Sequence, residues 1–163
     1  TSPEWDIWNN HDGSGKAFNS NESFALFIEA NSPDIVKPEP AKMLQLALNF
    51  RVNADVRFSL AQRLNDGNVE LGYQNVVSAT AGSGAGGKIQ IPEQFTLAIP
   101  VWAGLEAKKY PIDARFRYRL REGALTLWYE LIRPHKVMEQ AFKDLWVQIA
   151  KATRAPILHG TPE

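Results

Sequence analysis

Residues 115–131 read RFRYRLREGALTLWYEL, and their first half carries an arginine at every second position with apolar residues between. A period of two is typical of a half-buried β-strand, because successive side chains of a strand point to opposite faces. The pattern therefore predicts a strand with Phe116, Tyr118 and Leu120 on its buried face. All four guanidinium groups of this stretch fall on the opposite face and form a basic stripe.

A hairpin is predicted by Glu122-Gly123, which separates this strand from a second one at Leu125–Leu131. A two-residue turn fixes the register of the strands that it joins. Three pairs should face each other on the basic side: Arg119 and Thr126, Arg117 and Trp128, and Arg115 and Glu130. On the buried side, Phe116 and Tyr118 should meet Tyr129 and Leu127. We expect Glu130 to form an ion pair with Arg115.

Upstream of this hairpin, a second one is predicted from alternating residues at 56–60 and 69–73, with Asn65-Asp66-Gly67 as its turn. The segment 78–87 is small and glycine-rich, which is typical of a mobile loop. Residues 89–101 alternate but contain Pro92 and Pro100, which predicts one interrupted strand at a sheet edge or bulge.

Helical spacing of apolar residues occurs in three places. Two helices are predicted near the N-terminus, one from about Glu22 to Pro33 with Ser20 or Asn21 as its cap, and one from Pro40 to about Phe50. A third begins at Pro134 and should close over the apolar face of the sheet. Its apolar positions are Met138, Ala141, Phe142, Leu145, Trp146 and Ile149.

These elements predict an α+β fold: an antiparallel sheet of about five strands built from two hairpins, with two N-terminal helices and one C-terminal helix packed on it. A length of 163 residues suits one domain. We assign residues 21–155 to this domain, 1–20 to a loose N-terminal arm anchored by Trp5 and Trp8, and 156–163 to a C-terminal tail. The missing initiator methionine favours a fragment of a longer protein.

Composition restricts the function. Acidic and basic side chains number 18 each, so any attraction to phosphate must be local. The absence of cysteine excludes disulfide scaffolds, thiolate metal sites and cysteine nucleophiles. No apolar run approaches the ~20 residues of a membrane span, and the first residues lack a secretion signal. We expect no membrane association and a cytoplasmic location.

The sequence contains only weak matches to nucleotide-binding, metal-binding and catalytic motifs. GSGAGGK at residues 82–88 matches two phosphate-loop patterns, but a strand rather than a helix should follow it, and Ile89 stands where a magnesium-binding Ser or Thr belongs. The histidines His11, His135 and His159 lack metal-ligand spacing. No serine stands in a nucleophile elbow beside His11-Asp12. We therefore expect no catalytic residue, no cofactor and no metal site, and predict that the protein is not an enzyme.

The arginine stripe has two interpretations, which the sequence leaves open. The plainer one is a solvated strand whose like charges discourage sheet-to-sheet pairing. The functional one uses the spacing of alternate strand residues, about 6.8 Å, which is close to the phosphate spacing of an extended single strand, with Trp128 as a stacking surface. The same Arg and Trp side chains are also typical of protein interfaces.

Four strings, EWDIW at 4–8, SFALFIE at 23–29, IPEQFTLAIP at 91–100 and ARFRYRL at 114–120, resemble the YfdQ-like family of phage and prophage proteins over nearly the whole chain. Members are longer at the N-terminus, so the resemblance implies that this chain is the C-terminal part of such a protein. The family is uncharacterised. The resemblance therefore implies a phage origin and transfers no catalytic residue.

We accordingly predict a non-catalytic phage accessory binding module in the cytoplasm of the bacterial host. In the first version it associates with nucleic acid through Arg115, Arg117, Arg119, Arg121 and Trp128, helped by Lys88, Lys108 and Lys109. In the alternative it binds a host or phage protein, as an inhibitor or as a self-assembling structural component, through anchors near Trp5, Trp8 or Trp102. An enzyme ranks last. The sequence does not determine the oligomeric state.

Overall fold

The arginine-rich strand and its partner form the longest hairpin of the fold, β6 (Lys109–Arg121) and β7 (Ala124–Leu131). In the computed structural model, residues 1–52, 56–75, 86–154 and 160 are described. The predicted register is confirmed, with Arg115 opposite Glu130 and Arg117 opposite Trp128. Glu122 and Gly123 both have positive φ, 50° and 83°, as expected of a two-residue turn that follows the twist of its strands.

Seven described strands form two antiparallel sheets, so the α+β class is confirmed. The four-stranded sheet has the order β1-β5-β6-β7, with β1 at Ile35–Lys37 and β5 at Gln94–Pro100. The three-stranded sheet has the order β2-β3-β4, with β2 at Val56–Arg63, β3 at Val69–Asn75 and β4 at Gly86–Ile91. The prediction of a single sheet was therefore incomplete.

The stretch 89–101 is not one interrupted strand. It is divided at Pro92-Glu93, and its halves β4 and β5 pair with β3 and β6 in different sheets. Pro92 has no backbone N–H to continue the ladder, which is why the first strand ends there. Pro100 is the last residue of an interior strand and lies beyond the residues that pair with β1.

The turn between β2 and β3 lies where the sequence predicted it. Gly67 has a φ of 86°, and the Asp66 carboxylate accepts the backbone N–H of Asn68 at 3.0 Å. Most of the predicted glycine-rich loop at 78–87 lies outside the described residues. Its last two glycines, Gly86 and Gly87, begin β4.

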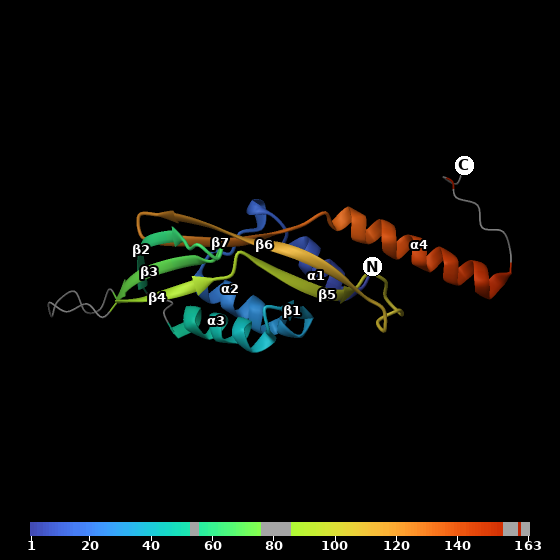
Figure 1. Ribbon diagram of the computed structural model, residues 1–163, viewed down its shortest axis with the longest axis horizontal. Helices are drawn as coiled ribbons and strands as arrows, with labels where there is room; N and C mark the ends of the chain where they lie inside the picture. The colour runs from blue at the N-terminus through green and yellow to red at the C-terminus, as the bar shows by residue number, and fades with distance from the viewer. Residues whose placement is uncertain (53–55, 76–85, 155–159, 161–163) are drawn as a thin grey trace.

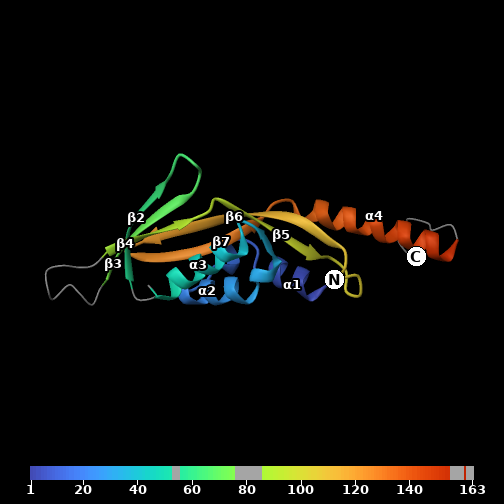
Figure 2. The same ribbon diagram turned by 60° about the horizontal axis from the view of Figure 1, so that its bottom comes forward.

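Three helices cover one face of the four-stranded sheet, and the β2–β3 hairpin projects from the opposite side (Figure 2). The predicted helices are α2 (Asn21–Ala30), capped by Ser20, and α3 (Pro40–Val52). The third is α1 (Pro3–Asn10), which was not predicted. Short 3-10 turns lie at Ser14–Lys16 and Ser32–Asp34.

The N-terminal segment is not a loose arm. Trp8 of α1 is fully buried, and its ring lies 5.0 Å from that of Phe27 and 5.3 Å from that of Tyr129. The chain then follows the outer edge of β7, where the N–H groups of Gly13 and Phe18 donate to the carbonyls of Tyr129 and Leu127 at 2.9 Å each. These bonds cover an edge strand that would otherwise present unpaired backbone groups.

Helix α4 (Pro134–Thr153) does not close over the sheet as predicted but extends beyond its end (Figure 1). Ala141 is its single buried residue among those described. The apolar face of the sheet is already occupied by α1 and α2, which leaves α4 only the end of the β5–β6 hairpin. There Trp102 Nε1 donates to the Ala141 carbonyl at 3.1 Å, and the Asp144 carboxylate binds Lys108 Nζ at 2.6 Å.

Nowhere in the described ranges is a helix both long and apolar enough to cross a membrane.

The turn of the long hairpin provides a first test. Gly123→Ala should lower the free energy of unfolding, measured in urea, by about 1–2 kcal/mol, because a Cβ is disfavoured at positive φ. The new Cβ would also lie 3.3 Å from Cγ of Arg57. Gly15→Ala is the control, since Gly15 lacks a positive φ and, apart from its neighbours in the chain, no atom lies within 4 Å of the place that its Cβ would take. Equal effects of the two substitutions would contradict the turn geometry.

Candidate functional site

The outward face of β6 carries the four predicted arginines. Arg115, Arg119 and Arg121 are exposed and Arg117 is half-buried, whereas Phe116 behind them is buried against the rings of Phe95 and Phe24 at 4.6 and 5.5 Å. The alternation expected from the sequence is therefore present in the structure. Burial of Phe116 fixes the position of the strand in the sheet. Because alternate residues of a strand point to the same side, the four arginines then form a row on the outward face.

Glu130 does not pair with Arg115, as the sequence suggested, but with Arg117. Arg117 Nε lies 2.9 Å from Oε2 of Glu130, and Trp128 Nε1 donates to Oε1 at 3.4 Å. Diagonal neighbours on adjacent strands lie within reach of long side chains, so facing positions alone do not decide an ion pair. The hydrogen bond from Arg117 lowers the pKa of Glu130, although a pair this exposed adds little stability.

The ring of Trp128 contacts Arg119 and is not exposed to solvent as a stacking surface. The guanidinium carbon of Arg119 lies 5.6 Å from the centre of the indole, a cation–π distance. Trp128 is only 9% exposed, although it stands on the outward side of the sheet. Little of its surface remains for a stacked base, and its contact positions the guanidinium group of Arg119.

One end of the row gains an arginine that the sequence analysis missed. Arg115 and Arg133 line a shallow hollow of about 420 Å³ together with Glu130, Leu131 and Ile132. Arg133 follows β7 and has a φ of 54°, in the left-handed region. It belongs to no periodic pattern, and only the path of the chain between β7 and α4 brings it beside Arg115.

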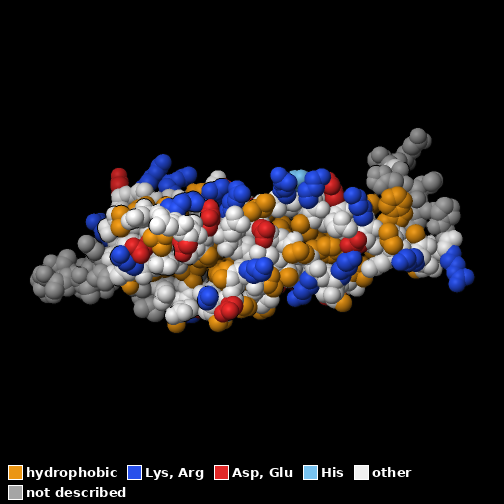
Figure 3. Space-filling model, in the orientation of Figure 1, with side chains coloured by type: hydrophobic (Ala, Val, Ile, Leu, Met, Phe, Trp, Pro, Cys, Tyr) orange, Lys and Arg blue, Asp and Glu red, His pale blue; other side chains and the backbone are white. Residues whose placement is uncertain are grey.

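The other end of the row gains Arg57, from β2. Its side-chain carbons lie beside Gly123 in the turn that follows Arg121, and the backbone N–H of Phe58 donates to the Gly123 carbonyl at 3.1 Å. No local signal in the sequence could join β2 to this turn. We call the set Arg57, Arg115, Arg117, Arg119, Arg121 and Arg133 the arginine face. Lys and Arg side chains follow the upper edge of the molecule in Figure 3.

Three lysines were expected to assist the arginines in binding phosphate, and two of them form ion pairs with acidic residues. Lys88 Nζ lies 2.9 Å from Glu70 on the three-stranded sheet, and Lys108 binds Asp144 of α4. Lys109 is exposed at the start of β6. The basic surface therefore depends on arginines alone along most of its length.

The groups considered for catalysis have other contacts in the described part of the chain. The described residues contain no cluster of three or more His, Cys, Asp or Glu side chains that could hold a metal ion. The Asp12 carboxylate accepts the backbone N–H of Leu131 at 2.8 Å, and burial raises its pKa, while the His11 ring packs against Phe27. The phosphate-loop string lies partly outside the described residues, and the strand β4 begins within it at Gly86.

Comparison with models of protein families matches residues 1–162 to a family described as "Uncharacterized conserved protein (DUF2303)". No curated protein and no solved structure gives a significant match. The family description names no activity, so the function has to be argued from the surface of the chain.

Proposed function

The chain belongs to the DUF2303 family of uncharacterized conserved proteins, and from this premise we propose that it is a non-catalytic module that binds nucleic acid on its arginine face. The observation that carries the proposal is the row of arginines on β6, extended at one end by Arg133 and at the other by Arg57. The resemblance to YfdQ-like phage and prophage proteins supports an accessory role in the cytoplasm of a bacterial host.

The spacing of the row suits a phosphate backbone. Arg115 and Arg121 are six residues apart on one strand, a span of about 20 Å by the rise of an antiparallel strand. Alternate positions are separated by about 6.8 Å, so successive guanidinium groups can contact successive phosphates of an extended single strand. A flat strand face also contacts a backbone without reading bases, which favours sequence-tolerant binding.

The charge of the whole chain shapes the expected affinity. Its 18 acidic and 18 basic residues cancel, so attraction arises only near the arginine face and should fall steeply with salt. Arg117 is held by Glu130 and Arg119 lies over Trp128. Arg115 and Arg121, for which the described residues show no ion pair, are the more direct phosphate contacts.

The test is anisotropy of a labelled single-stranded oligonucleotide, titrated against salt, for the native chain and for Arg115→Ala with Arg121→Ala. Loss of two phosphate contacts should reduce the slope of log K against log salt by about 1.4, from about 0.7 per phosphate on a single strand. At low salt we expect a loss of affinity of about tenfold or more, because the phosphate contacts supply most of such binding.

The matched control is Lys42→Ala with Arg51→Ala, which removes the same charge from exposed positions of α3, on the opposite side of the four-stranded sheet. It should leave both affinity and slope nearly unchanged. Absence of binding by the native chain at low salt, or equal losses in the two double variants, would overturn the nucleic-acid proposal.

A protein-binding factor is the second candidate, and the exposed apolar side of α4 favours it. The large side chains of Phe142 and Ile149 are exposed there. Of the three tryptophans considered as anchors, Trp5 and Trp8 are buried in the core, and Trp102 is half-buried beside α4. We therefore place the protein-binding surface of this candidate at α4 and Trp102.

A further inference from the structure

A small pocket lies where the turn of the β6–β7 hairpin meets the start of α2. Gly123 and Ala124 line it from the hairpin, Ser20 and Asn21 from the start of α2, and Phe58 from β2. Its volume is about 190 Å³. That volume far exceeds the space of about 10–15 Å³ that holds one water molecule, and it lies below the range of about 300–1,000 Å³ for drug-sized ligands. The pocket therefore suits a single ring or a group of similar size.

The side-chain amide of Asn21 gives this pocket its chemical character. Asn21 is only 7% exposed, and its amide makes no hydrogen bond to any other residue that the structure describes. Ser20, and not Asn21, caps α2, because its hydroxyl accepts the N–H of Ser23 at 3.1 Å. Buried polar groups of folded proteins nearly always have a partner. Since an amide offers both donors and an acceptor, the pocket can bind a group that presents an acceptor beside a donor.

The lining of the pocket carries no charged side chain. Besides the residues above it consists of Asn19 and Leu125, so it offers amides, a hydroxyl and apolar surface. A phosphate would find no cation inside it, and the carboxylate of Glu22, in the first turn of α2, would repel an anion there. The pocket therefore favours a neutral group with a polar edge.

Arginines border the pocket on its outer side. The side-chain carbons of Arg57 lie beside Gly123, with Cγ 3.3 Å from the place that a Cβ would take there. Ala124 faces Arg121 across the hairpin, and facing residues of an antiparallel pair point to the same side of the sheet. A neutral pocket thus lies at the end of the arginine face, as a neutral base lies beside the charged phosphate of a nucleotide.

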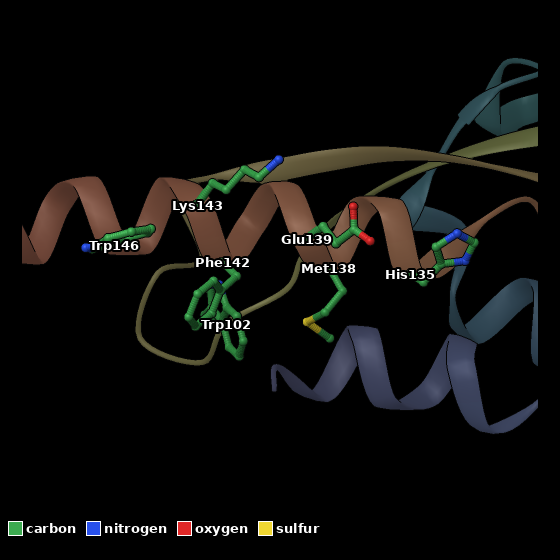
Figure 4. A pocket seen from close by; sticks show the side chains of 7 residues that line it. All are labelled: Trp102, His135, Met138, Glu139, Phe142, Lys143 and Trp146. Atoms are coloured by element: carbon green, nitrogen blue, oxygen red, sulfur yellow. The ribbon is translucent and has the colours of Figure 1, made fainter. Parts of the chain in front are cut away.

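The larger groove beside α4 is less selective. It has a volume of about 440 Å³, and Lys143 and Glu139 contribute opposite charges to its lining. Figure 4 shows Met138 and Phe142 pointing from α4 to the side on which Trp102 lies. The indole N–H of Trp102 is already bonded to the Ala141 carbonyl. Its lining thus favours neither sign of charge, whereas the pocket at the hairpin turn combines one size, one buried amide and one border of cations.

We propose that the pocket at the hairpin turn binds one nucleobase of a single strand that lies along the arginine face. The Asn21 amide contacts the hydrogen-bonding edge of the base, and Arg57 and Arg121 contact the neighbouring phosphates. Adenine is the expected base, because an asparagine amide can accept from its N6 and donate to its N7 at the same time. The flat face of β6 tolerates any sequence, and the pocket adds a preference at one nucleotide. This inference rests on nucleic-acid binding by the arginine face.

The experiment compares three labelled single strands of about 12 nucleotides, within the usual site size of single-strand binders. One strand is oligo-deoxyadenylate, one is oligo-thymidylate, and the third has the same phosphates but abasic sugars. Anisotropy titrations of the native chain should show about fivefold or tighter binding of the adenine strand than of the thymine strand, as one bidentate contact provides. The abasic strand should bind most weakly, with a similar salt slope, because its phosphates are equal in number.

Asn21→Ala should remove about fivefold or more of the adenine preference and leave the salt slope unchanged. Since no hydrogen bond within the described protein is lost, the midpoint of urea unfolding should not fall. Ala124→Leu, at an exposed position, places a larger side chain at the pocket from the hairpin side and should have the same effect with α2 unaltered. Asn10→Ala is the control, because it removes an amide from an exposed position of α1 outside the pocket. It should change the preference by less than about twofold, as a surface substitution outside the contact.

Equal affinity of the native chain for all three strands would overturn the base pocket, while a steep salt slope shared by the three would still support contacts to the phosphate backbone. A preference that Asn21→Ala and Ala124→Leu leave unchanged, or that Asn10→Ala reduces as much, would also overturn the pocket. Absence of binding to every strand at low salt would overturn nucleic-acid binding by the arginine face and this inference with it.

Discussion

Trp8→Ala is expected to lower the free energy of unfolding by about 3–5 kcal/mol, the range for large-to-small changes of a buried aromatic residue. The Trp8 ring contacts Phe27, Phe95 and Tyr129, and its Nε1 donates to Asp34 Oδ2 at 2.8 Å. Since domains are stable by about 5–15 kcal/mol in total, this single change should bring the protein close to its unfolding threshold. Urea denaturation followed by circular dichroism measures it.

The control for this change is Ile7→Ala on the same helix. Ile7 is 38% exposed, so its truncation should cost only about 0.5 kcal/mol, as is usual for surface positions. If Trp8→Ala were no more destabilising than Ile7→Ala, residues 1–20 would be the loose arm that the sequence suggested. A large difference would show that the N-terminal helix is part of the core in solution.

Phe24→Ala should produce a loss of similar size, about 3–5 kcal/mol, for a different reason. Phe24 of α2 is fully buried where the helices meet the sheet, and its ring lies 5.5 Å from Phe116 of β6 and 5.6 Å from Phe50 of α3. Alanine would leave a cavity at the point where α2, α3 and β6 meet, so that contacts among all three elements are lost. Thermal unfolding should show a transition lowered by several degrees or more, since 1 kcal/mol corresponds to about 2–8 °C for a domain of this general size.

Leu26→Ala is the comparison for Phe24→Ala. Leu26 is on the same helix, two residues further along the chain, and is 49% exposed. Its substitution should leave the transition temperature almost unchanged, because little apolar surface is removed from the interior. Similar shifts for the two variants would mean that α2 does not pack on the sheet through Phe24.

The core contact at Phe24 also connects stability with the candidate site. Phe116, its partner, stands between Arg115 and Arg117 on β6 and faces the opposite side of the strand. Weakening this contact should make β6 more mobile, and with it the four arginines, although no arginine is substituted. We therefore expect Phe24→Ala to reduce oligonucleotide affinity near its transition temperature, and Leu26→Ala to leave it unchanged.

Local patterns in the sequence determined the elements that depend on neighbouring residues. The alternation at 115–131, with a two-residue turn at Glu122-Gly123, was sufficient to predict the second half of β6, most of β7 and the five facing pairs named in advance. Helical periodicity and the Ser20 cap predicted α2 in the same way. These signals arise from side-chain periodicity and backbone turns, which act within one hairpin or one helix.

Tertiary structure decided whatever depends on residues far apart in the chain. The burial of Trp8, the division of the strands into two sheets and the placing of Arg57 beside the β6–β7 turn are contacts across long stretches of sequence. The choice of Arg117 over Arg115 as partner of Glu130 depends on the diagonal reach of side chains, which facing positions do not specify. Amphipathic periodicity predicted an apolar side for α4 but not where the helix lies, because three other helices cover the face of the sheet on which it was expected to pack.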